Sequence, residues 1–527
     1  MRTLQRAAAA LIYPAILCLG VACERTDTPT EGRLLASLAD PATLLVDDDL
    51  VQCPNAQYTS IQAAVNAAGP GDHIDVCPGT YREQVIIPAG KDNIRLRSTQ
   101  RWQAVIQAPL VMTLDPFVTT AFTIVRIAGA QNVTILACTI TGPGPGSCGS
   151  LHYGVRVHDG GSAVILGNHI TQIKDNVPSG CQNGVAILVG RWVDATTGSA
   201  RIIGNVIDDY QKNGPTVDNA GSHAEIAHNR ILSLPSGIIA RNGIQVSRGA
   251  TADIGHNFVS QNTFTPGTVA STGILFFGSG PVFTDHNTLT SNDVGVFMDN
   301  NASLPFGPGC GTPGGSDIAQ NRVRASTFDG AVLAGAFPCQ VSNVQVAHNK
   351  SDNNTGPGIG VYDGSHDNGV DDNKVEQNKD SGILLDDGDN NSVGDNQVRN
   401  NGSAGLDVTD GIRLNTSSMG NTVHDNHLRD NVTHDCHDNG TGNTWVNNHG
   451  ETSMPPGLCG RDDNDADFET ATVYGWDPAY PWYDAFDVAA DFDWAAAYAT
   501  IDTESLMQLL PVIPTGGIRR GRPSPDQ

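Results

Sequence analysis

A short glycine-led motif recurs along most of this chain and restricts its possible folds more than any other feature. The motif consists of a glycine, alternating branched residues and a polar end, and its clearest copies lie at 154–160, 184–190, 243–249, 295–301, 358–364, 382–388 and 405–411. A second element built around an asparagine follows most copies. In the shortest repeats, Asn349, Asn373 and Asn396 are separated by 24 and then 23 residues. A unit of this length cannot bury an apolar face alone, so the units must stack, about 4.8 Å apart, to close a common core.

Each repeat is predicted to contain two or three very short strands, joined by tight turns of glycine, asparagine and aspartate. Alternation along a strand directs the second and fourth residues of each copy inward and the third and fifth residues outward. In the copy at 382–388, this places Ile383 and Leu385 in the core. We expect the recurring asparagines to turn inward as a ladder, each amide bonding to the coils above and below.

With these repeats, the chain resembles the right-handed parallel β-helix proteins of the pectin-lyase-like superfamily from residue 45 to residue 460. The segment at 58–88, YTSIQAAVNAAGPGDHIDVCPGTYREQVIIP, is similar to their N-terminal capping helix and first strands. The repeat also resembles that of the periplasmic accessory proteins of nitrous oxide reductase. The resemblance implies an all-β, single-stranded right-handed parallel β-helix, or solenoid, with an N-terminal capping helix and a partly helical C-terminal tail. It leaves the function open, because this fold hosts lyases, hydrolases, esterases, epimerases and non-catalytic binders.

The two ends of the chain depart from the repeat. Residues 1–22 combine early arginines with an apolar run, which is typical of an export signal. The following LGVAC resembles a bacterial lipoprotein box and would make Cys23 the lipidated N-terminus, whereas an ordinary signal peptidase site is the alternative. We expect a tether at 23–44 and an acidic, aromatic extension at 461–527. The protein is then an outer-membrane or cell-surface lipoprotein, or is secreted, and meets a membrane only through Cys23.

Eleven cysteines in an exported chain suggest disulfides. The predicted pairs are Cys53 with Cys77, Cys148 with Cys181, Cys310 with Cys339, and Cys436 with Cys459. Cys138, inside the apolar TILACTI, then remains as a buried free thiol.

The charge of the chain narrows the range of partners. Its formal net charge is -26, with only 30 lysines and arginines. Binding to nucleic acid or to an anionic membrane requires clustered positive charge, so we expect neither. The charge also disfavours a polyanionic substrate unless cations or a local basic cleft intervene. We expect a monomer whose partner is a polysaccharide.

The outward positions change character along the repeats. The middle copies carry an apolar outer patch, which an inserted loop, the C-terminal tail or sugar rings must cover, at Leu275, Phe277, Phe297 and Val332. Toward the C-terminal end the same positions become polar and acidic. The superfamily resemblance implies that polysaccharide lies in a groove on the outer face of one parallel sheet.

Candidate functional residues follow from this outer row. The candidate catalytic groups are Tyr362, His366, Asp386 and Arg413, and the candidate substrate-binding groups are Asp299, Asp363 and Arg248. Elimination or epimerisation at a uronate needs Ca²⁺ or Arg to neutralise the carboxylate and a side chain to take the proton, whereas hydrolysis needs two suitably separated carboxylates. Stacked rungs bring Asp363 and Asp387 together as candidate Ca²⁺ ligands.

Many of the acidic and histidine residues also have a structural interpretation. Asp followed by Gly at the end of a strand is a favoured turn, and this predicts turns at Asp159, Asp363, Asp387 and Asp410. HDNHLRDNVTHDCHDNG lacks zinc-like ligand spacing, so a terminal turn near a disulfide is expected for His424, His427, His434 and His437.

Two functions remain from the sequence. The first is an exported, lipid-anchored parallel β-helix protein that binds a polysaccharide and cleaves or epimerises it, as a lyase, hydrolase or epimerase. The alternative is a non-catalytic surface protein for glycan binding, adhesion or spacing. The G-H-G motif of polygalacturonase-like hydrolases is missing, and the Y-G-F-D-P-H site of alginate epimerases has only a partial counterpart in VYDGSHD at 361.

Overall fold

A computed structural model describes residues 41–115, 121–178, 180–234, 238–265, 267, 269–302, 307–335, 337–405 and 409–460. The expected export signal, Cys23, most of the tether and the extension at 461–527 lie outside the described residues.

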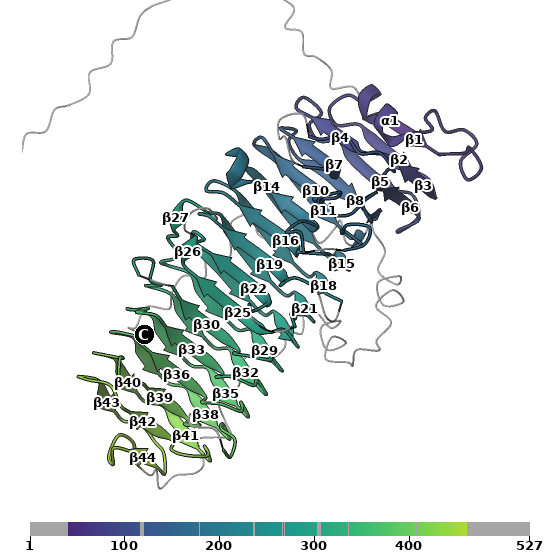
Figure 1. Ribbon diagram of the computed structural model, residues 1–527. Helices are drawn as coiled ribbons and strands as arrows, with labels where there is room; N and C mark the ends of the chain where they lie inside the picture. The colour runs from purple at the N-terminus through teal and green to yellow at the C-terminus, as the bar shows by residue number, and fades with distance from the viewer. Residues whose placement is uncertain are drawn as a thin grey trace, which may run out of the picture. The chain divides into compact units, whose positions relative to one another are not determined.

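The described chain winds through three parallel sheets, and most coils contribute one strand to each sheet (Figure 1). The 15-stranded sheet contains β1 Thr43–Val46, β2 His73–Val76, β5 Arg95–Ser98, β8 Val133–Leu136, β11 Gly161–Leu166, β14 Gly198–Ile203, β17 His223–Ala227, β20 Thr251–Gly255, β23 Val282–Asp285, β28 Asp317–Ala319, β31 Gln345–Ala347, β34 Gly369–Asp371, β37 Ser392–Gly394, β40 Thr422–His424 and β43 Thr444–Val446. The 14-stranded sheet contains β4 Val85–Pro88, β7 Thr123–Ala128, β10 Tyr153–His158, β13 Val185–Val189, β16 Asn213–Asp218, β19 Asn242–Ser247, β22 Thr272–Phe277, β25 Val294–Asp299, β30 Ala331–Ala334, β33 Ile359–Tyr362, β36 Ile383–Asp386, β39 Ile412–Leu414, β42 Cys436–Asp438 and β44 Ser453–Met454.

The third sheet has 13 strands. It contains β3 Gly79–Arg82, β6 Ala104–Gln107, β9 Thr139–Thr141, β12 His169–Thr171, β15 Val206–Asp208, β18 Arg230–Leu232, β21 Phe258–Ser260, β24 Thr288–Thr290, β29 Arg322–Arg324, β32 Lys350–Asp352, β35 Lys374–Glu376, β38 Gln397–Arg399 and β41 His427–Arg429. The remaining elements are the antiparallel pair β26 Asn301–Ala302 and β27 Gly309–Cys310, the helix α1 Ile61–Ala67 and a single 3₁₀ turn at Trp192–Asp194. The predicted parallel β-helix is therefore confirmed.

Inward-facing residues stack in columns through the core, as the alternation predicts. Ile359, Ile383 and Ile412 occupy equivalent positions in β33, β36 and β39. Ile383 and Leu385 have no exposed surface. Stacking like on like gives each coil the apolar neighbours that its short strands cannot supply themselves.

The predicted asparagine ladder is confirmed. The backbone N–H and side-chain Nδ2 of Asn349 donate to Oδ1 of Asn373 at 2.9 and 3.0 Å, and Asn373 donates in the same way to Asn396 at 2.9 and 3.1 Å. These contacts repeat from Asn168 to Asn448. They give hydrogen-bond partners to buried backbone N–H groups in the turns, which no neighbouring strand pairs with.

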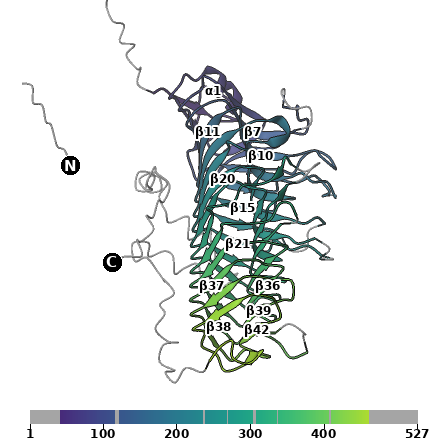
Figure 2. The same ribbon diagram turned by 90° about the vertical axis from the view of Figure 1, so that its left-hand side faces the viewer.

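The helix α1 lies at the N-terminal end of the stack, as expected for a cap (Figure 2). Ser60 accepts a hydrogen bond from the N–H of Ala63 and so caps the first turn. Ile61, Ala64 and Val65 are fully buried and extend the core of the first coils.

Two of the motif copies have a different register from the one the sequence suggests. Val185 pairs with Tyr153, so Leu188 rather than Ala186 lies beside Arg156. Ile412 pairs with Ile383, so the last copy begins at Gly411 and not at 405. Both errors arise where an inserted loop carries its own glycine, such as Gly184 and Gly405, which have positive φ and form turns.

Four disulfides join Cys53 to Cys77, Cys148 to Cys181, Cys310 to Cys339 and Cys436 to Cys459, the same pairs that the sequence suggested. Cys138 is a free, buried thiol, and burial raises its pKa to about 12. This number of disulfides is typical of a protein that works outside the cytoplasm. Within the described residues, the structure has no helix with the length and apolarity needed to cross a bilayer.

Candidate functional site

The outer face of the 14-stranded sheet carries a pocket of about 570 Å³, centred on β25, β30, β33 and β36. Its apolar lining consists of Ala270, Val294, Phe297, Phe328, Val332 and Ala334. Its polar lining consists of Asp329, Tyr362, Asp363, Asp386 and Asp387. Phe297 and Val332 of the predicted apolar outer patch therefore meet part of the predicted acidic row in one cavity, whereas Leu275 and Phe277 are not among its lining residues.

The register of the sheet explains how these side chains come together. Phe297 pairs with Val332, which pairs with Gly360, and this column forms the apolar side. Ala334 lies beside Asp299 in the neighbouring column, and Tyr362 pairs with Asp386. Strand alternation points both columns away from the core.

The glycine at 360 gives the ring of Tyr362 its position. A Cβ atom at this residue would overlap the ring and hydroxyl of Tyr362. The ring therefore folds back over the backbone of its own strand, across the space that a side chain would fill. From there its hydroxyl donates a hydrogen bond of 2.8 Å to Oδ2 of Asp329.

Asp329 and Tyr362 form a hydrogen-bonded pair, and both residues are half-buried. Burial raises the pKa of Asp329 to about 6, although the hydrogen bond from Tyr362 acts in the opposite direction. Burial and the neighbouring Asp329 carboxylate raise the pKa of Tyr362 well above its usual value. Near neutral pH the tyrosine keeps its proton, and the aspartate can gain or lose one. Asp329 thus has the properties of a general acid.

Four of the predicted site residues, Tyr362, Asp363, Asp386 and Asp387, line the pocket. Asp299 lies at its edge, beside Ala334, and accepts a hydrogen bond of 2.9 Å from the N–H of Asn301. Burial, helped by the charge on Asp363, raises the pKa of Asp299.

The other three predicted residues lie elsewhere. His366 follows the turn after β33, and its Nδ1 is 2.8 Å from the Asp367 carboxylate. Arg413 lies further along the same outer face, and its Nη1 donates to Asp410 at 3.0 Å.

Arg248 lies in the opposite direction along the sheet, after β19. It forms an ion pair of 2.6 Å with Asp218 and stacks on Phe277 at 5.7 Å. None of these three residues is among the described residues that line the pocket.

Asp329 is the polar pocket residue that sequence reasoning missed. It stands immediately before Gly330, outside the seven-residue motif, and in a copy whose match to the motif is loose. The signal was nevertheless present, because the residue before the motif glycine lies on the outer face next to the strand that follows.

Asp363 and Asp387 occupy adjacent turns, as predicted, with φ of 57° and 62°. Both are exposed at the rim of the pocket. In the described part of the chain, the groups that bring three metal-ligand atoms within 4.8 Å lie elsewhere. Calcium at these two residues remains a prediction.

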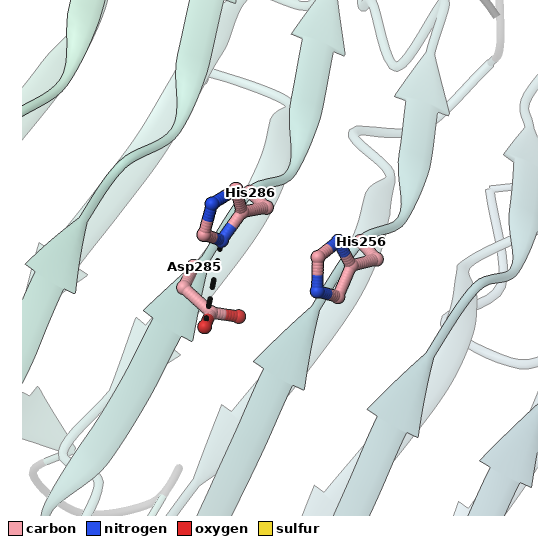
Figure 3. A group of neighbouring side chains, drawn as sticks. All are labelled: His256, Asp285 and His286. Atoms are coloured by element: carbon pink, nitrogen blue, oxygen red, sulfur yellow. Dashed lines mark ion pairs between the residues drawn. The ribbon is translucent and has the colours of Figure 1, made fainter. Parts of the chain in front are cut away.

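One such group consists of His256 and His286, in the turns that precede the ladder residues Asn257 and Asn287, and Asp285, at the end of β23 (Figure 3). His256 and His286 have positive φ and stack face to face, with ring centroids 4.8 Å apart and planes 17° apart. His228 stacks on the other face of His256 at 4.9 Å. Because the rings are parallel, their nitrogen atoms lie side by side and do not point at one common place. The stacking follows from the repeat of the coil, which places a histidine at the same turn position in successive coils.

The second group, Asp410, His434 and His437, corrects two expectations. Asp410 does not form a turn: its side chain is fully buried and lies within 3.0 Å of Arg413, His434 and His437. The reason is the register, since Asp410 precedes the last motif glycine rather than ending a copy. His424, His427 and His437 lie within β40, β41 and β42 rather than in a terminal turn. The third group is a run of neighbouring acids, Asp47 to Asp49.

Comparisons with known proteins agree with the fold. The sequence matches the family described as the right handed beta helix region over residues 123–308, 192–368 and 309–449. A search of curated proteins finds no match.

Three solved structures illustrate the similarity. The periplasmic alginate epimerase AlgG is 12% identical over 78% of this chain and 85% of its own, with a TM-score of 0.39. The A-module of the Azotobacter vinelandii mannuronan C-5 epimerase AlgE4 is 16% identical over 75% and 94%, with a TM-score of 0.41. The DFA-IIIase from Arthrobacter chlorophenolicus A6 is 15% identical over 73% and 92%, with a TM-score of 0.42.

At such identities the likeness concerns the fold alone, and the activities of these proteins stay theirs. The family match is different, because its three segments together cover more than half of the chain. The chain belongs to the right-handed β-helix family.

Proposed function

We propose that this protein binds a polysaccharide across the outer face of the 14-stranded sheet and hydrolyses a glycosidic bond in the pocket between β25 and β36. The observation that carries the proposal is the Asp329–Tyr362 pair, held at 2.8 Å beside an apolar wall and facing further carboxylates. The protein acts outside the cytoplasm, and lipidation of Cys23 anchors it to a membrane.

The two walls of the pocket suit the two kinds of surface on a sugar. Phe297, Val332 and Ala334 offer an apolar surface to the C–H face of a pyranose ring. Asp363, Asp386 and Asp387 are exposed carboxylates that accept hydrogen bonds from sugar hydroxyls. A few convergent polar groups on an apolar surface are typical of small-molecule and saccharide sites.

The pocket favours a neutral glycan over a polyuronate. Its lining contains four aspartates, and no lysine or arginine is among the described residues that form it. A uronate carboxylate would be repelled there. Arg413, which could neutralise one, is instead hydrogen-bonded to Asp410 and Asn415.

The protonation states favour hydrolysis over elimination or epimerisation. Elimination needs a base such as a tyrosinate, whereas the raised pKa of Tyr362 keeps its hydroxyl protonated. Asp329, with a pKa of about 6, can protonate a departing glycosidic oxygen and is held in place by Tyr362. Asp386, which pairs with Tyr362 in the next strand, supplies the second carboxylate that hydrolysis requires.

The test is to incubate the purified chain with a panel of neutral and uronic-acid glycans while following reducing ends and the absorbance of unsaturated products. We expect reducing ends from a neutral glycan without unsaturated products. Asp329→Asn and Tyr362→Phe should each lower the rate at least about a hundredfold, because they remove the acid or the group that positions it.

Asp159→Asn is the matched control. Asp159 lies on the outer turn after β10, far along the sheet from the pocket, and Asn tolerates its φ of 56°. Its rate should equal that of the unaltered chain. Unsaturated products, or glycan binding without turnover by the unaltered chain, would replace the hydrolase proposal with the lyase or the non-catalytic binding function.

A further inference from the structure

A second constellation of side chains lies on the same outer face, beyond the pocket, where β39 and β42 run side by side. Its centre is the carboxylate of Asp410, whose side chain has no exposed surface. Nδ1 of His434 lies 3.0 Å from Oδ1, and Nδ1 of His437 lies 2.8 Å from Oδ2. One buried carboxylate therefore has a separate imidazole at each of its two oxygens.

The backbone fixes these three residues relative to each other. The N–H of Gly411 donates to the carbonyl of His434 at 2.8 Å, which sets Asp410 beside His434 across the two coils. Arg413 pairs with His437 in the β39–β42 register. The His-x-x-His spacing then returns the second imidazole to the carboxylate, because His434 lies just before β42 and His437 lies within it.

The two imidazole rings approach each other at right angles. Their centroids are 5.1 Å apart and their planes differ by 79°. This differs from the stacked His256 and His286, whose planes are nearly parallel. In this structure each Nδ1–H donates to the Asp410 carboxylate in the plane of its ring, and an ion that replaces these two protons would face both Nδ1 lone pairs and the carboxylate.

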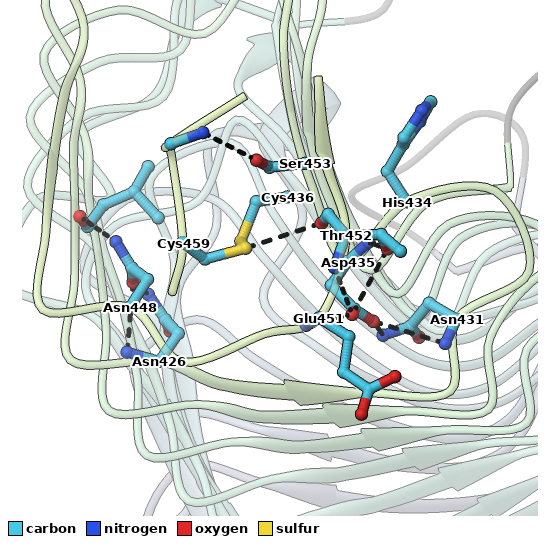
Figure 4. The surroundings of a disulfide bond; sticks show 12 residues. Asn426, Asn431, His434, Asp435, Cys436, Asn448, Glu451, Thr452, Ser453 and Cys459 are labelled. Atoms are coloured by element: carbon cyan, nitrogen blue, oxygen red, sulfur yellow. Dashed lines mark hydrogen bonds between the residues drawn. A yellow bond between two sulfur atoms is a disulfide. The ribbon is translucent and has the colours of Figure 1, made fainter. Parts of the chain in front are cut away.

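Secondary contacts hold this group rigidly. Arg413 donates to Oδ2 of Asp410 at 3.0 Å and is itself fixed by Asn415 at 2.7 Å. Cys436, between the two histidines, is bonded to Cys459, which ties β42 to the end of the described chain (Figure 4). Hydrogen bonds to a ligating carboxylate, and a rigid backbone under the ligands, are regular features of metal sites in proteins.

We propose that Asp410, His434 and His437 form a binding site for a divalent transition-metal ion of the Zn²⁺ class. Two imidazoles and one carboxylate are ligands that suit zinc and cobalt rather than calcium, which prefers six or more oxygens. Ligand atoms around tetrahedral Zn²⁺ are about 3.3 Å apart. The two Nδ1–carboxylate pairs, at 3.0 and 2.8 Å, would therefore part by about 0.3 and 0.5 Å to admit the ion, and the three ligand atoms lie within 4.8 Å of one another. The half-buried His434 leaves one side open for a water molecule or a substrate oxygen.

The charge of the surroundings is compatible with a dication. Arg413 is the one cation that lies against Asp410 among the described residues, and Asp380 is close enough for its charge to act on both. The backbone N–H of His434 donates a further hydrogen bond of 3.1 Å to Oδ1 of Asp410, which helps to hold the carboxylate in place.

The test uses tag-free full chain, stripped with EDTA and titrated with Zn²⁺ in a calorimeter and with Co²⁺ by visible absorption. We expect one ion per chain and the visible bands of four- or five-coordinate cobalt. His434→Ala and His437→Ala should each weaken Zn²⁺ binding at least about tenfold, since loss of a ligand costs no less than loss of a supporting contact. Ca²⁺ should not compete.

His424→Ala and His427→Ala are matched controls from the same histidine-rich segment. His424 contacts Ser392 and Asp425, and His427 stacks on His449, so neither approaches Asp410. They should bind Zn²⁺ like the unaltered chain. Because His434 is the more exposed ligand, its variant decides the question if His437→Ala does not fold. Equal Zn²⁺ binding by the unaltered chain and a His434→Ala/His437→Ala variant would overturn the proposal, and so would an equal loss in the controls.

Discussion

Replacement of one interior rung of the asparagine ladder should destabilise the whole stack of coils. In Asn373→Ala, Oδ1 no longer accepts from the N–H and Nδ2 of Asn349. The side-chain donations to the carbonyls of Val346 and Asp371 and to Asn396 are lost as well. Asn373 is 1% exposed, so the groups left behind have little access to water.

The magnitude follows from the number of buried groups that lose a partner. Each unsatisfied buried donor or acceptor costs about 1–3 kcal/mol. The N–H of Asn349 and the carbonyl of Val346 lose the contacts described above. Two such groups, with partial relief by a water molecule in the space of the lost amide, give an expected destabilisation of about 3 kcal/mol.

The assay is equilibrium unfolding in guanidinium chloride, followed by circular dichroism, with Asn439→Ala as the control. Asn439 is exposed, and it belongs to the turn after β42 rather than to a ladder. Its replacement should change the free energy of unfolding by less than about 0.5 kcal/mol. An effect of Asn373→Ala no larger than that of the control would refute the view that the ladder stabilises the turns.

Three further predictions concern the two sites. The raised pKa of Asp329 means that the folded state holds the proton of this carboxyl more tightly than the unfolded chain does. The stability that this group contributes is therefore present below about pH 4 and is lost as the pH rises to about 6, by at most about 3 kcal/mol. Melting temperatures of Asp329→Asn should lack this part of the pH dependence, and an unchanged pH profile would contradict the assignment. Gly360→Ala should displace the ring of Tyr362, because the new Cβ takes the space of the ring. The rate of glycan hydrolysis should then fall at least about tenfold, with little change in melting temperature. An unaltered rate would show that the position of the ring is unimportant. Cys436→Ser should weaken Zn²⁺ binding about tenfold in calorimetry, because β42 loses its disulfide to Cys459. Undiminished Zn²⁺ affinity would mean that the disulfide does not support the site.

The interior of this fold could be predicted from the sequence because every coil solves the same packing problem. Strand alternation and the branched residues of the motif placed Ile383 and Leu385 in the core, where they are fully buried. The asparagine before each third-sheet strand had one structural explanation, and the hydrogen bonds between Asn349, Asn373 and Asn396 confirm it.

The outer face was harder to predict, because its register depends on where inserted loops leave and rejoin the stack. The sequence analysis found no copy of the motif in the coil of β16. Pro215 occupies the position there that branched residues such as Ile187 occupy in neighbouring coils. The copies at 184–190 and 405–411 were shifted because glycines of inserted loops imitate the motif glycine. The copy at 184–190 was shifted by two residues and the copy at 405–411 by six, and these shifts moved every outward residue. Val185, expected in the core, lies instead in a separate cluster with Tyr153 and Leu188.

The residue before the motif glycine connects the pocket with the proposed metal site. The N–H groups of Gly330, Gly358, Gly382 and Gly411 donate in turn to the carbonyls of Pro357, Ser381, Asp410 and His434. Asp329 precedes Gly330, so Asp329, Pro357, Ser381, Asp410 and His434 form one column along the edge of the 14-stranded sheet.

Three coil spacings, or about 14 Å, separate Asp329 from Asp410 along this column. The charge of Asp380 couples the two sites. It raises the pKa of Tyr362 and of Asp329, and the pKa of Asp380 itself depends on the charges of Arg413 and Asp410. A glycan lying across the strands from the pocket would therefore reach the water-exposed side of His434. Packing constrains the core residues of each coil, whereas the residues of this column lie at the edge of the outer face. Different residues in this column can therefore give the fold two different sites on one face without any change in the coil.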